Sequence, residues 1–150
     1  MKELFIVTGA TGWLGRNYLH YLQEKIPREE YNEKVFAYGS SEKIISSTAY
    51  GINKEINIKI RPFEDLKKKF LNCPNLYIIH TAFITREKIS FYGLKNYIYL
   101  NKEISSTLKD LIKSSHGCRC VITSSGAANI AERNKQDNSF IEHNPYAYLK

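Results

Sequence analysis

The chain has 150 residues, 43% of them hydrophobic and 25% charged, which is enough to bury a core and typical of a soluble globular protein. It contains no run of about 18 apolar residues, and its first apolar run stops at Val7, so the sequence predicts neither a membrane span nor a signal peptide and favours the cytoplasm. The net charge of +7 suits anionic ligands, but the charges are scattered and no recognition helix or stacking platform is found, which argues against nucleic-acid binding.

The three cysteines give no sign of a disulfide framework. Cys73, Cys118 and Cys120 are an odd number without a Cys-x-x-Cys pair, which predicts reduced thiols. His116 could be written as a metal ligand together with Cys118 and Cys120. These residues lie at the edge of an apolar strand, where alternate side chains point to opposite faces, and no fourth ligand is evident. We therefore predict no metal site.

The chain begins with a strand, a glycine turn and a helix. Residues 4–7 form a short apolar run, and the pattern turns helical after Thr8. Gly9 permits a tight turn, Gly12 lacks a side chain where a pyrophosphate would approach the backbone, and Gly15 lets the helix pack on the strand. The free N–H groups of the helix start, with the positive end of its dipole, would face the phosphates.

The spacing G-x-x-G-x-x-G differs from the commoner G-x-G-x-x-G fingerprint. Its position directly after a strand and at the start of an amphipathic helix nevertheless predicts a dinucleotide site. The alternative is a glycine-rich connection that only packs. We expect the helix to pack through one face, formed by Leu14, Tyr18, Leu19 and Leu22.

The end of the second strand bears on which dinucleotide is bound. This strand is expected at residues 34–38 and is closed by Gly39. In folds that prefer NAD, an Asp or Glu at this strand end binds the ribose hydroxyls. Here Gly39 takes that place, followed by Ser40, Ser41 and Lys43. Small hydroxyls and a cation suit a 2′-phosphate, so the sequence favours NADP over NAD; the alternative is a plain turn with a surface lysine.

The remaining elements complete an alternating pattern. We expect a charged connection at 27–33, an irregular segment at 44–56, strands at 56–60, 75–80 and 119–123, a short helix at 63–70, a basic connection at 84–96 and a long helix at 97–114. Five strands alternating with helices predict an α/β fold, a Rossmann-type doubly wound parallel sheet of strand order 3-2-1-4-5. Ligands of such sheets bind beyond the carboxyl ends of the strands, where residues 9–15, 81–83 and 124–125 are all expected.

Asn101 stands out on the long helix. It shares a stripe with apolar residues, namely Ile104, Leu108, Leu111 and Ile112. An amide on an apolar stripe needs a hydrogen-bond partner. Asn101 is therefore either a buried structural group or part of a site.

The end of the chain carries a candidate for proton transfer. Tyr146 and Lys150 are four residues apart and share one face of a helix. Tyrosine is a poor base at its reference pKa of about 10, but a nearby ammonium favours the phenolate. Ser125 could hold the reacting oxygen while Tyr146 exchanges its proton. The pair alone occurs often by chance; its position after Ser125 and the glycine turn makes it far more specific.

Together these motifs resemble the extended short-chain dehydrogenase/reductase family, the NAD(P)-dependent sugar epimerases and dehydratases. The matching segments are Thr8-Gly-Ala-Thr-Gly-Trp-Leu-Gly15, His80-Thr-Ala82, Asn101, Ser124-Ser125 and Pro145-Tyr-Ala-Tyr-Leu-Lys150. The resemblance implies hydride transfer between a nicotinamide cofactor and a small-molecule substrate such as a nucleotide sugar, with Tyr146 giving or taking the hydroxyl proton.

The resemblance also implies site residues. The cofactor pyrophosphate would be held by Gly9, Gly12, Trp13, Leu14 and Gly15. The cofactor would be lined by Thr81, Ala82 and Phe83, with Asn101 supporting the site. Catalysis would fall to Ser125, Tyr146 and Lys150, of which Lys150 would also bind the nicotinamide ribose.

Two departures from the family pattern shape the expectation. Many members read x-x-Val-Tyr-Gly after the serine pair, where this chain has Ala127-Ala128-Asn129-Ile130, so no particular nucleotide-sugar reaction is assigned and NADP-dependent reductases are admitted. The chain stops at Lys150, so we expect residues 1–150 to be the NAD(P)-binding N-terminal part of a longer enzyme, truncated before the last strands and the substrate domain. The rival readings are a non-catalytic dinucleotide-binding sensor or scaffold and an inactive remnant, whose exposed edge at the fifth strand would favour a homodimer.

Overall fold

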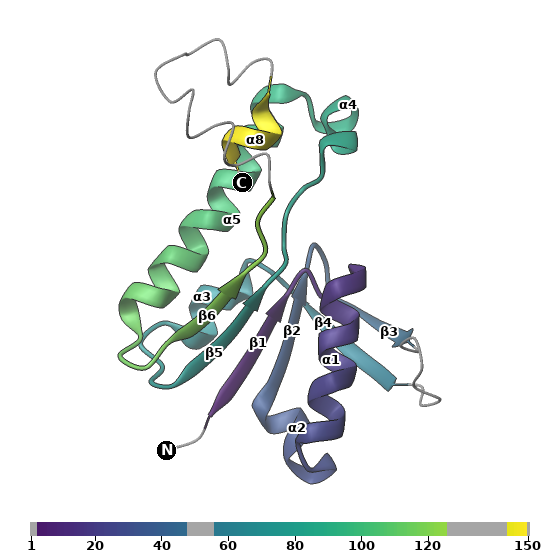
Figure 1. The fold of residues 1–150 in the computed structure, drawn as a ribbon, viewed down its shortest axis with the longest axis vertical. Helices are drawn as coiled ribbons and strands as arrows, with labels where there is room; N and C mark the ends of the chain where they lie inside the picture. Colours follow the sequence, from purple (N-terminus) through teal and green to yellow (C-terminus); the bar gives the residue numbers. More distant parts are fainter. Residues whose placement is uncertain (1–2, 48–55, 126–143, 150) are drawn as a thin grey trace. The chain divides into compact units, whose positions relative to one another are not determined.

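The computed structural model describes residues 3–47, 56–125 and 144–149 (Figure 1). The chain divides into two compact units. The first consists of Met1–Ala82 and Thr107–Ile122, and the second of Phe83–Ser106 and Thr123–Lys150. The first unit contains the sheet and the second contains the C-terminal helix, and each is described by itself.

The described part of the first unit is built on a six-stranded sheet of order β3-β4-β2-β1-β5-β6. The strands are β1 (Leu4–Thr8), β2 (Val35–Gly39), β3 (Lys43–Ser47), β4 (Ile56–Pro62), β5 (Leu76–His80) and β6 (Arg119–Ile122). All neighbouring pairs are parallel except β3 and β4. With β1, β2, β4, β5 and β6 as the five predicted strands, the predicted doubly wound α/β fold and its order 3-2-1-4-5 are confirmed. The antiparallel strand β3 is an addition at the edge.

The register brings the candidate cofactor segments of the first unit to one edge of the sheet. Thr8, the last residue of β1, lies opposite Tyr38 of β2 and His80 of β5. The glycine turn follows Thr8 directly, Ser40 follows the end of β2, and Thr81 follows the end of β5. Parallel pairing therefore places these segments beside one another, as expected for the carboxyl ends of a Rossmann-type sheet.

Helices cover both faces of the sheet (Figure 1). The described helices are α1 (Trp13–Lys25), α2 (Arg28–Lys34), α3 (Asp65–Phe70), the 3-10 helix η1 (Arg86–Lys88), α4 (Ile89–Tyr92), α5 (Leu94–Ser114) and α8 (Pro145–Leu149). Helix α1 begins immediately after Gly12, its N-cap residue, and ends before Pro27. The long helix α5 contributes residues to both units.

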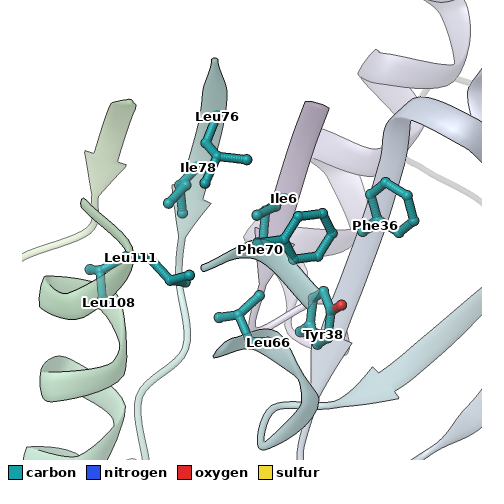
Figure 2. Packing of buried hydrophobic residues seen from close by; sticks show 9 residues of the cluster. All are labelled: Ile6, Phe36, Tyr38, Leu66, Phe70, Leu76, Ile78, Leu108 and Leu111. Atoms are coloured by element: carbon teal, nitrogen blue, oxygen red, sulfur yellow. The ribbon is translucent and has the colours of Figure 1, made fainter. Parts of the chain in front are cut away.

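The alternation of β1 explains the two cores. Ile6 points to one face, where it joins the buried residues of α3 and α5, and Val7 points to the other, where it joins Leu19 and Leu22 of α1. Figure 2 shows the first cluster, with the aromatic side chains of α3 and β2 beside Ile6. There the Phe70 ring packs edge-on against Phe36, with 5.0 Å between ring centroids. Each face is therefore sealed by its own helices.

The prediction of a connection without secondary structure at residues 27–33 is wrong. It is the helix α2, although none of its residues is fully buried. Glu29 and Glu30 in its first turn and Lys34 in its last turn complement the helix dipole, and Glu30 and Lys34 form an ion pair one turn apart. Local electrostatics thus favours a helix where the apolar pattern is weak.

Three further expectations need correction. Within the segment expected to be irregular, residues up to Ser47 continue β3, whose pairing with β4 could not be read from local pattern. The connection expected at 84–96 contains η1, α4 and the first residues of α5. Leu14, expected on the buried face of α1, is 49% exposed, whereas Leu19 and Leu22 of that face are buried.

Candidate cofactor-binding turn and tyrosine cluster

Gly9 occupies a position that excludes other residues for two reasons. Its φ of +68° lies in the left-handed region, which side chains with a Cβ rarely adopt. A Cβ at Gly9 would also lie 2.5 Å from Thr81 Oγ1 and 2.7 Å from the Ala82 nitrogen. The turn after β1 therefore passes directly against the end of β5, and only glycine permits this approach.

Gly15 is required by the packing of α1 against the turn. It is buried, and a Cβ there would overlap the Gly9 carbonyl oxygen and lie 2.9 Å from Ala10 Cα. The absence of a side chain lets the start of the helix lie on the backbone of the turn. This geometry agrees with the packing role expected from the sequence.

Gly12 differs from its two neighbours in the motif. It is exposed, its φ of −77° is ordinary, and a Cβ would meet one atom within 4 Å, the Gly9 carbonyl oxygen at 3.2 Å. The internal packing of the protein therefore explains Gly9 and Gly15 far better than Gly12. A methyl group at Gly12 would stand at the exposed N-terminus of α1 and would require the Gly9 carbonyl oxygen to shift by a few tenths of an ångström.

The start of α1 is suited to an anion. The first intrahelical bond runs from the Arg16 N–H to the Gly12 carbonyl (3.0 Å), so the preceding N–H groups lack intrahelical acceptors. The helix has no side-chain cap and no acidic residue in its first turn. Trp13 is 72% exposed there and Leu14 is about half exposed. Uncapped N–H groups and the positive end of the helix dipole fit a phosphate group.

Backbone hydrogen bonds fix the turn to both neighbouring strands. The Ala10 N–H donates to the Tyr38 carbonyl (3.1 Å) at the end of β2. On the other side, the Thr81 N–H and hydroxyl both donate to the Thr8 carbonyl, at 3.2 and 2.7 Å. Thr81 thus belongs to the wall of the turn, and its hydroxyl proton is engaged within the protein.

Sequence reasoning did not assign a role to the buried pair of Thr8 and His80. Thr8 Oγ1 lies 2.8 Å from His80 Nδ1, and their side chains are 0% and 6% exposed. This bond joins the last residues of β1 and β5, immediately below the glycine turn. His80 begins one of the segments that match the family, but its pairing with Thr8, 72 residues away in the sequence, is seen only in the fold.

The residues proposed to select NADP all lie at the surface. Ser40, Ser41 and Lys43 are exposed at the end of β2 and the start of β3. Glu42, the carboxylate between them, forms an ion pair with Lys59 (3.0 Å) on β4. Two hydroxyls and an amine are therefore accessible there, while the neighbouring negative charge is neutralised by Lys59.

In the second unit, Asn101 is a buried hydrogen-bonding centre. Its side chain is 2% exposed; Oδ1 accepts from the Ile84 N–H (2.9 Å), and Nδ2 donates to the Ile84 carbonyl (3.2 Å) and the Tyr97 carbonyl (3.1 Å). Both amide hydrogens are thus engaged by the backbone. Through these bonds Asn101 holds Ile84, in the segment that follows Phe83.

Tyr146 lies in an aromatic cluster with Phe83 and Tyr97, which we call the tyrosine cluster. The Phe83 centroid is 5.4 Å from that of Tyr146 and 6.4 Å from that of Tyr97, and both contacts are edge-to-face. Tyr97 is completely buried. Burial raises the pKa of Tyr97, Tyr146 and Glu87 raise it further, and Arg86 lowers it. Sequence reasoning missed Tyr97, although it lies four residues before Asn101 on the same stripe.

The other predicted site residues are placed as follows. Ala82 is partly buried directly after Thr81, and Ser125 is partly buried in the second unit, to which Tyr146 also belongs. Lys150 and the segment 127–130 lie outside the described residues. The structure therefore brings together Gly9, Gly12, Gly15 and Thr81 in one unit, and Phe83, Asn101 and Tyr146 in the other.

The described residues contain no group of three or more His, Cys, Asp or Glu side chains that could hold a metal ion. Cys118 and Cys120 are partly buried against the core, and burial raises the pKa of Cys120 to about 11. Both are free thiols. Over the same described ranges, no helix is both long enough and apolar enough to cross a membrane.

The doubly wound sheet and the glycine turn define a nucleotide-binding protein of the Rossmann type. Residues 5–150 match the NAD dependent epimerase/dehydratase family, and the chain belongs to this family. Its cofactor class is therefore a nicotinamide dinucleotide. Searches of curated proteins and of solved structures gave no significant match.

Proposed function

We propose that this chain binds NAD(P) at the glycine turn and serves an oxidoreduction, epimerisation or dehydration of a small molecule, with a nucleotide sugar as one candidate substrate. One observation carries the proposal. Packing within the protein accounts for Gly9 and Gly15, whereas a Cβ at the exposed Gly12, at the uncapped start of α1, would meet just the Gly9 carbonyl oxygen, at 3.2 Å, among the described residues. A glycine there is what the close approach of a pyrophosphate requires.

The pyrophosphate would be bound mainly by backbone. The N–H groups at the start of α1 would donate to its oxygens, with Gly9 and Gly15 shaping the turn beneath them. The exposed side chains of Trp13 and Leu14 would cover it. The segment Thr81 to Phe83 would line the remainder of the cofactor, supported through Ile84 by Asn101.

The proton-transfer role falls to residues near the end of the chain. A bound nicotinamide supplies the hydride acceptor or donor. Tyr146 would give or take the substrate hydroxyl proton, Ser125 would hold the reacting oxygen, and the Lys150 ammonium would favour the Tyr146 phenolate and bind the nicotinamide ribose. The packing of Tyr146 against Phe83, the last residue of the predicted cofactor-lining segment, supports this assignment.

We propose NADP as the preferred dinucleotide. Ser40, Ser41 and Lys43 offer hydroxyls and an ammonium at the strand end where NAD-preferring folds carry a free carboxylate. Glu42, the carboxylate between Ser41 and Lys43, is paired with Lys59. A 2′-phosphate would therefore meet an electropositive surface.

The single tryptophan provides a direct test of binding. Trp13 stands at the proposed pyrophosphate site, and its emission overlaps the absorption of reduced nicotinamide. Titration with NADPH should quench Trp13 emission to a saturable limit, and NADPH should bind more tightly than NADH. Absence of saturable quenching by either dinucleotide would contradict the cofactor site. An affinity for NADH at least tenfold higher than that for NADPH would contradict only the NADP preference.

We propose that residues 1–150 act as one cofactor-binding domain whose substrate contacts come from residues outside it. The chain alone should then bind dinucleotide without turnover. Turnover of any substrate by the isolated chain would contradict this division. The rival, a non-catalytic sensor or scaffold, would bind cofactor but has no need of the Ser125, Tyr146 and Lys150 set. In a catalytically complete protein, unchanged turnover after Tyr146→Phe would contradict the assignment of Tyr146 as the proton-transfer group.

A further inference from the structure

One buried polar group in the tyrosine cluster has no role in the chemistry proposed above. Tyr97 is 0% exposed, and its hydroxyl has no hydrogen-bond partner among the described residues. A phenylalanine would fill the same space without burying an unsatisfied hydroxyl, which destabilises a folded protein. The hydroxyl therefore fits a hydrogen bond that is made only in another protonation or ligand state.

The surroundings of Tyr97 point to Tyr146 as that partner. Phe83 contacts both tyrosine rings edge-on, so the three rings form one connected cluster. Tyr97 is held firmly in place, because its carbonyl accepts from the Asn101 amide, which also binds both backbone groups of Ile84. The charged or titratable groups that act on the Tyr97 hydroxyl are Tyr146 on α8 and Glu87 and Arg86 on η1.

We propose that Tyr97 is a positioning residue for Tyr146, and that its O–H donates a hydrogen bond, directly or through one water, to the Tyr146 phenolate. The proposal rests on the proposed role of Tyr146 as acid and base. The Phe83 ring that packs against Tyr146 offers no hydrogen bond to a phenolate, whereas a fixed hydroxyl nearby can donate one. The bond is strongest when Tyr146 is deprotonated, because a phenolate is a stronger acceptor than a phenol.

In this role Tyr97 stays protonated while Tyr146 gives up its proton. When Tyr146 acts as an acid, its proton leaves for the substrate oxygen, while Tyr97 keeps its own proton and remains a donor. Burial raises the pKa of Tyr97, and the negative charges of Tyr146 and Glu87 raise it further against the smaller opposing effect of Arg86. Tyr97 therefore does not compete as a second base at neutral pH.

The test is a titration of Tyr146 that needs neither cofactor nor turnover. The full chain is labelled with [13Cζ]tyrosine, and the Tyr146 resonance is identified as the one lost in Tyr146→Phe. In Tyr97→Phe the midpoint of the Tyr146 titration should lie about one pH unit higher, a tenfold weaker acid. Tyr99→Phe, a matched change at a 59% exposed position of the same helix, should leave the midpoint unchanged.

The stability of the variant separates this role from a structural one. Because the Tyr97 hydroxyl has no partner in the described structure, Tyr97→Phe should not lower the thermal midpoint of unfolding. An unchanged Tyr146 titration would overturn the proposal, and so would a Tyr97→Phe chain that is destabilised or fails to fold. Failure of the proposed function would instead appear as absent cofactor binding, with the coupling of the two tyrosines still measurable.

Discussion

The backbone of Gly9 combines a left-handed conformation with a close contact, and substitution should reveal both. We expect Gly9→Ala to lower the free energy of unfolding by about 2–5 kcal/mol, from backbone strain and from overlap with Thr81. Urea denaturation of Gly9→Ala and of the wild type measures the loss. A loss of less than about 1 kcal/mol would contradict both the backbone strain and the contact with Thr81.

Asn101 should contribute mainly through the hydrogen bonds of its side chain. Asn101→Leu leaves the Ile84 N–H, the Ile84 carbonyl and the Tyr97 carbonyl without this partner, so we expect a loss of about 2–4 kcal/mol in the free energy of unfolding. Asn96→Leu, at an exposed position of the same helix, should cost little. The comparison is made by urea denaturation. A loss for Asn101→Leu no larger than that for Asn96→Leu would show that the amide network adds nothing.

At the scale of the elements, the partly buried Tyr31 and the buried Tyr38 make the packing of α2 and β2 sensitive to alkali. Burial raises the pKa of Tyr31 and of Tyr38 to about 12. In the unfolded chain both titrate near 10, so their contribution to stability is complete below about pH 10 and is lost as the pH rises toward 12. The free energy of unfolding should therefore fall steeply over this interval.

The variant Tyr38→Phe isolates one of these two groups. The Tyr38 hydroxyl is buried without a hydrogen-bond partner among the described residues, so its removal should not destabilise the protein at neutral pH. Urea denaturation near pH 8 and near pH 11 should show a smaller alkaline loss for Tyr38→Phe than for the wild type. Identical losses would mean that Tyr38 is not the group that titrates.

The edge strand β6 is a candidate surface for self-association. Val121 and Ile122 are 61% and 54% exposed, and no described strand pairs with the free edge of β6. We expect concentration-dependent association of the chain, weakened by Val121→Lys and less affected by Ile44→Lys on the opposite edge strand β3. Sedimentation velocity over a concentration series measures this. A chain that stays monomeric throughout would contradict the homodimer expectation.

The elements that could be predicted are those with strong local patterns. The apolar runs of β1 and β5 and the apolar stripe of α5 are visible in the sequence because burial on the sheet requires them. Helix α2 was missed because none of its residues is fully buried and its charges, not an apolar face, favour the helix. Strand β3 was missed because its place depends on β4, a contact between segments.

Across the whole molecule, the alternation of strands and helices was enough to predict the strand order, because right-handed crossovers leave few arrangements of a parallel sheet. The glycine turn could be located because its three glycines lie directly between an apolar run and a helical pattern, and the structure shows the steric need for Gly9 and Gly15. Tyr97 and His80 could not be assigned in this way. Their importance comes from partners that only the fold brings near, Phe83 for Tyr97 and Thr8 for His80.

The central claim is that Gly12 is a glycine for the sake of a bound dinucleotide, and calorimetric titration of NADP tests it most directly. In Gly12→Ala the new methyl carbon would lie 3.2 Å from the Gly9 carbonyl oxygen, which has to move only slightly. The variant should therefore fold with nearly the stability of the wild type. We predict that the wild type binds NADP and that Gly12→Ala binds it at least about tenfold more weakly, a loss of roughly 1.4 kcal/mol. Equal affinities in two folded proteins would contradict the account.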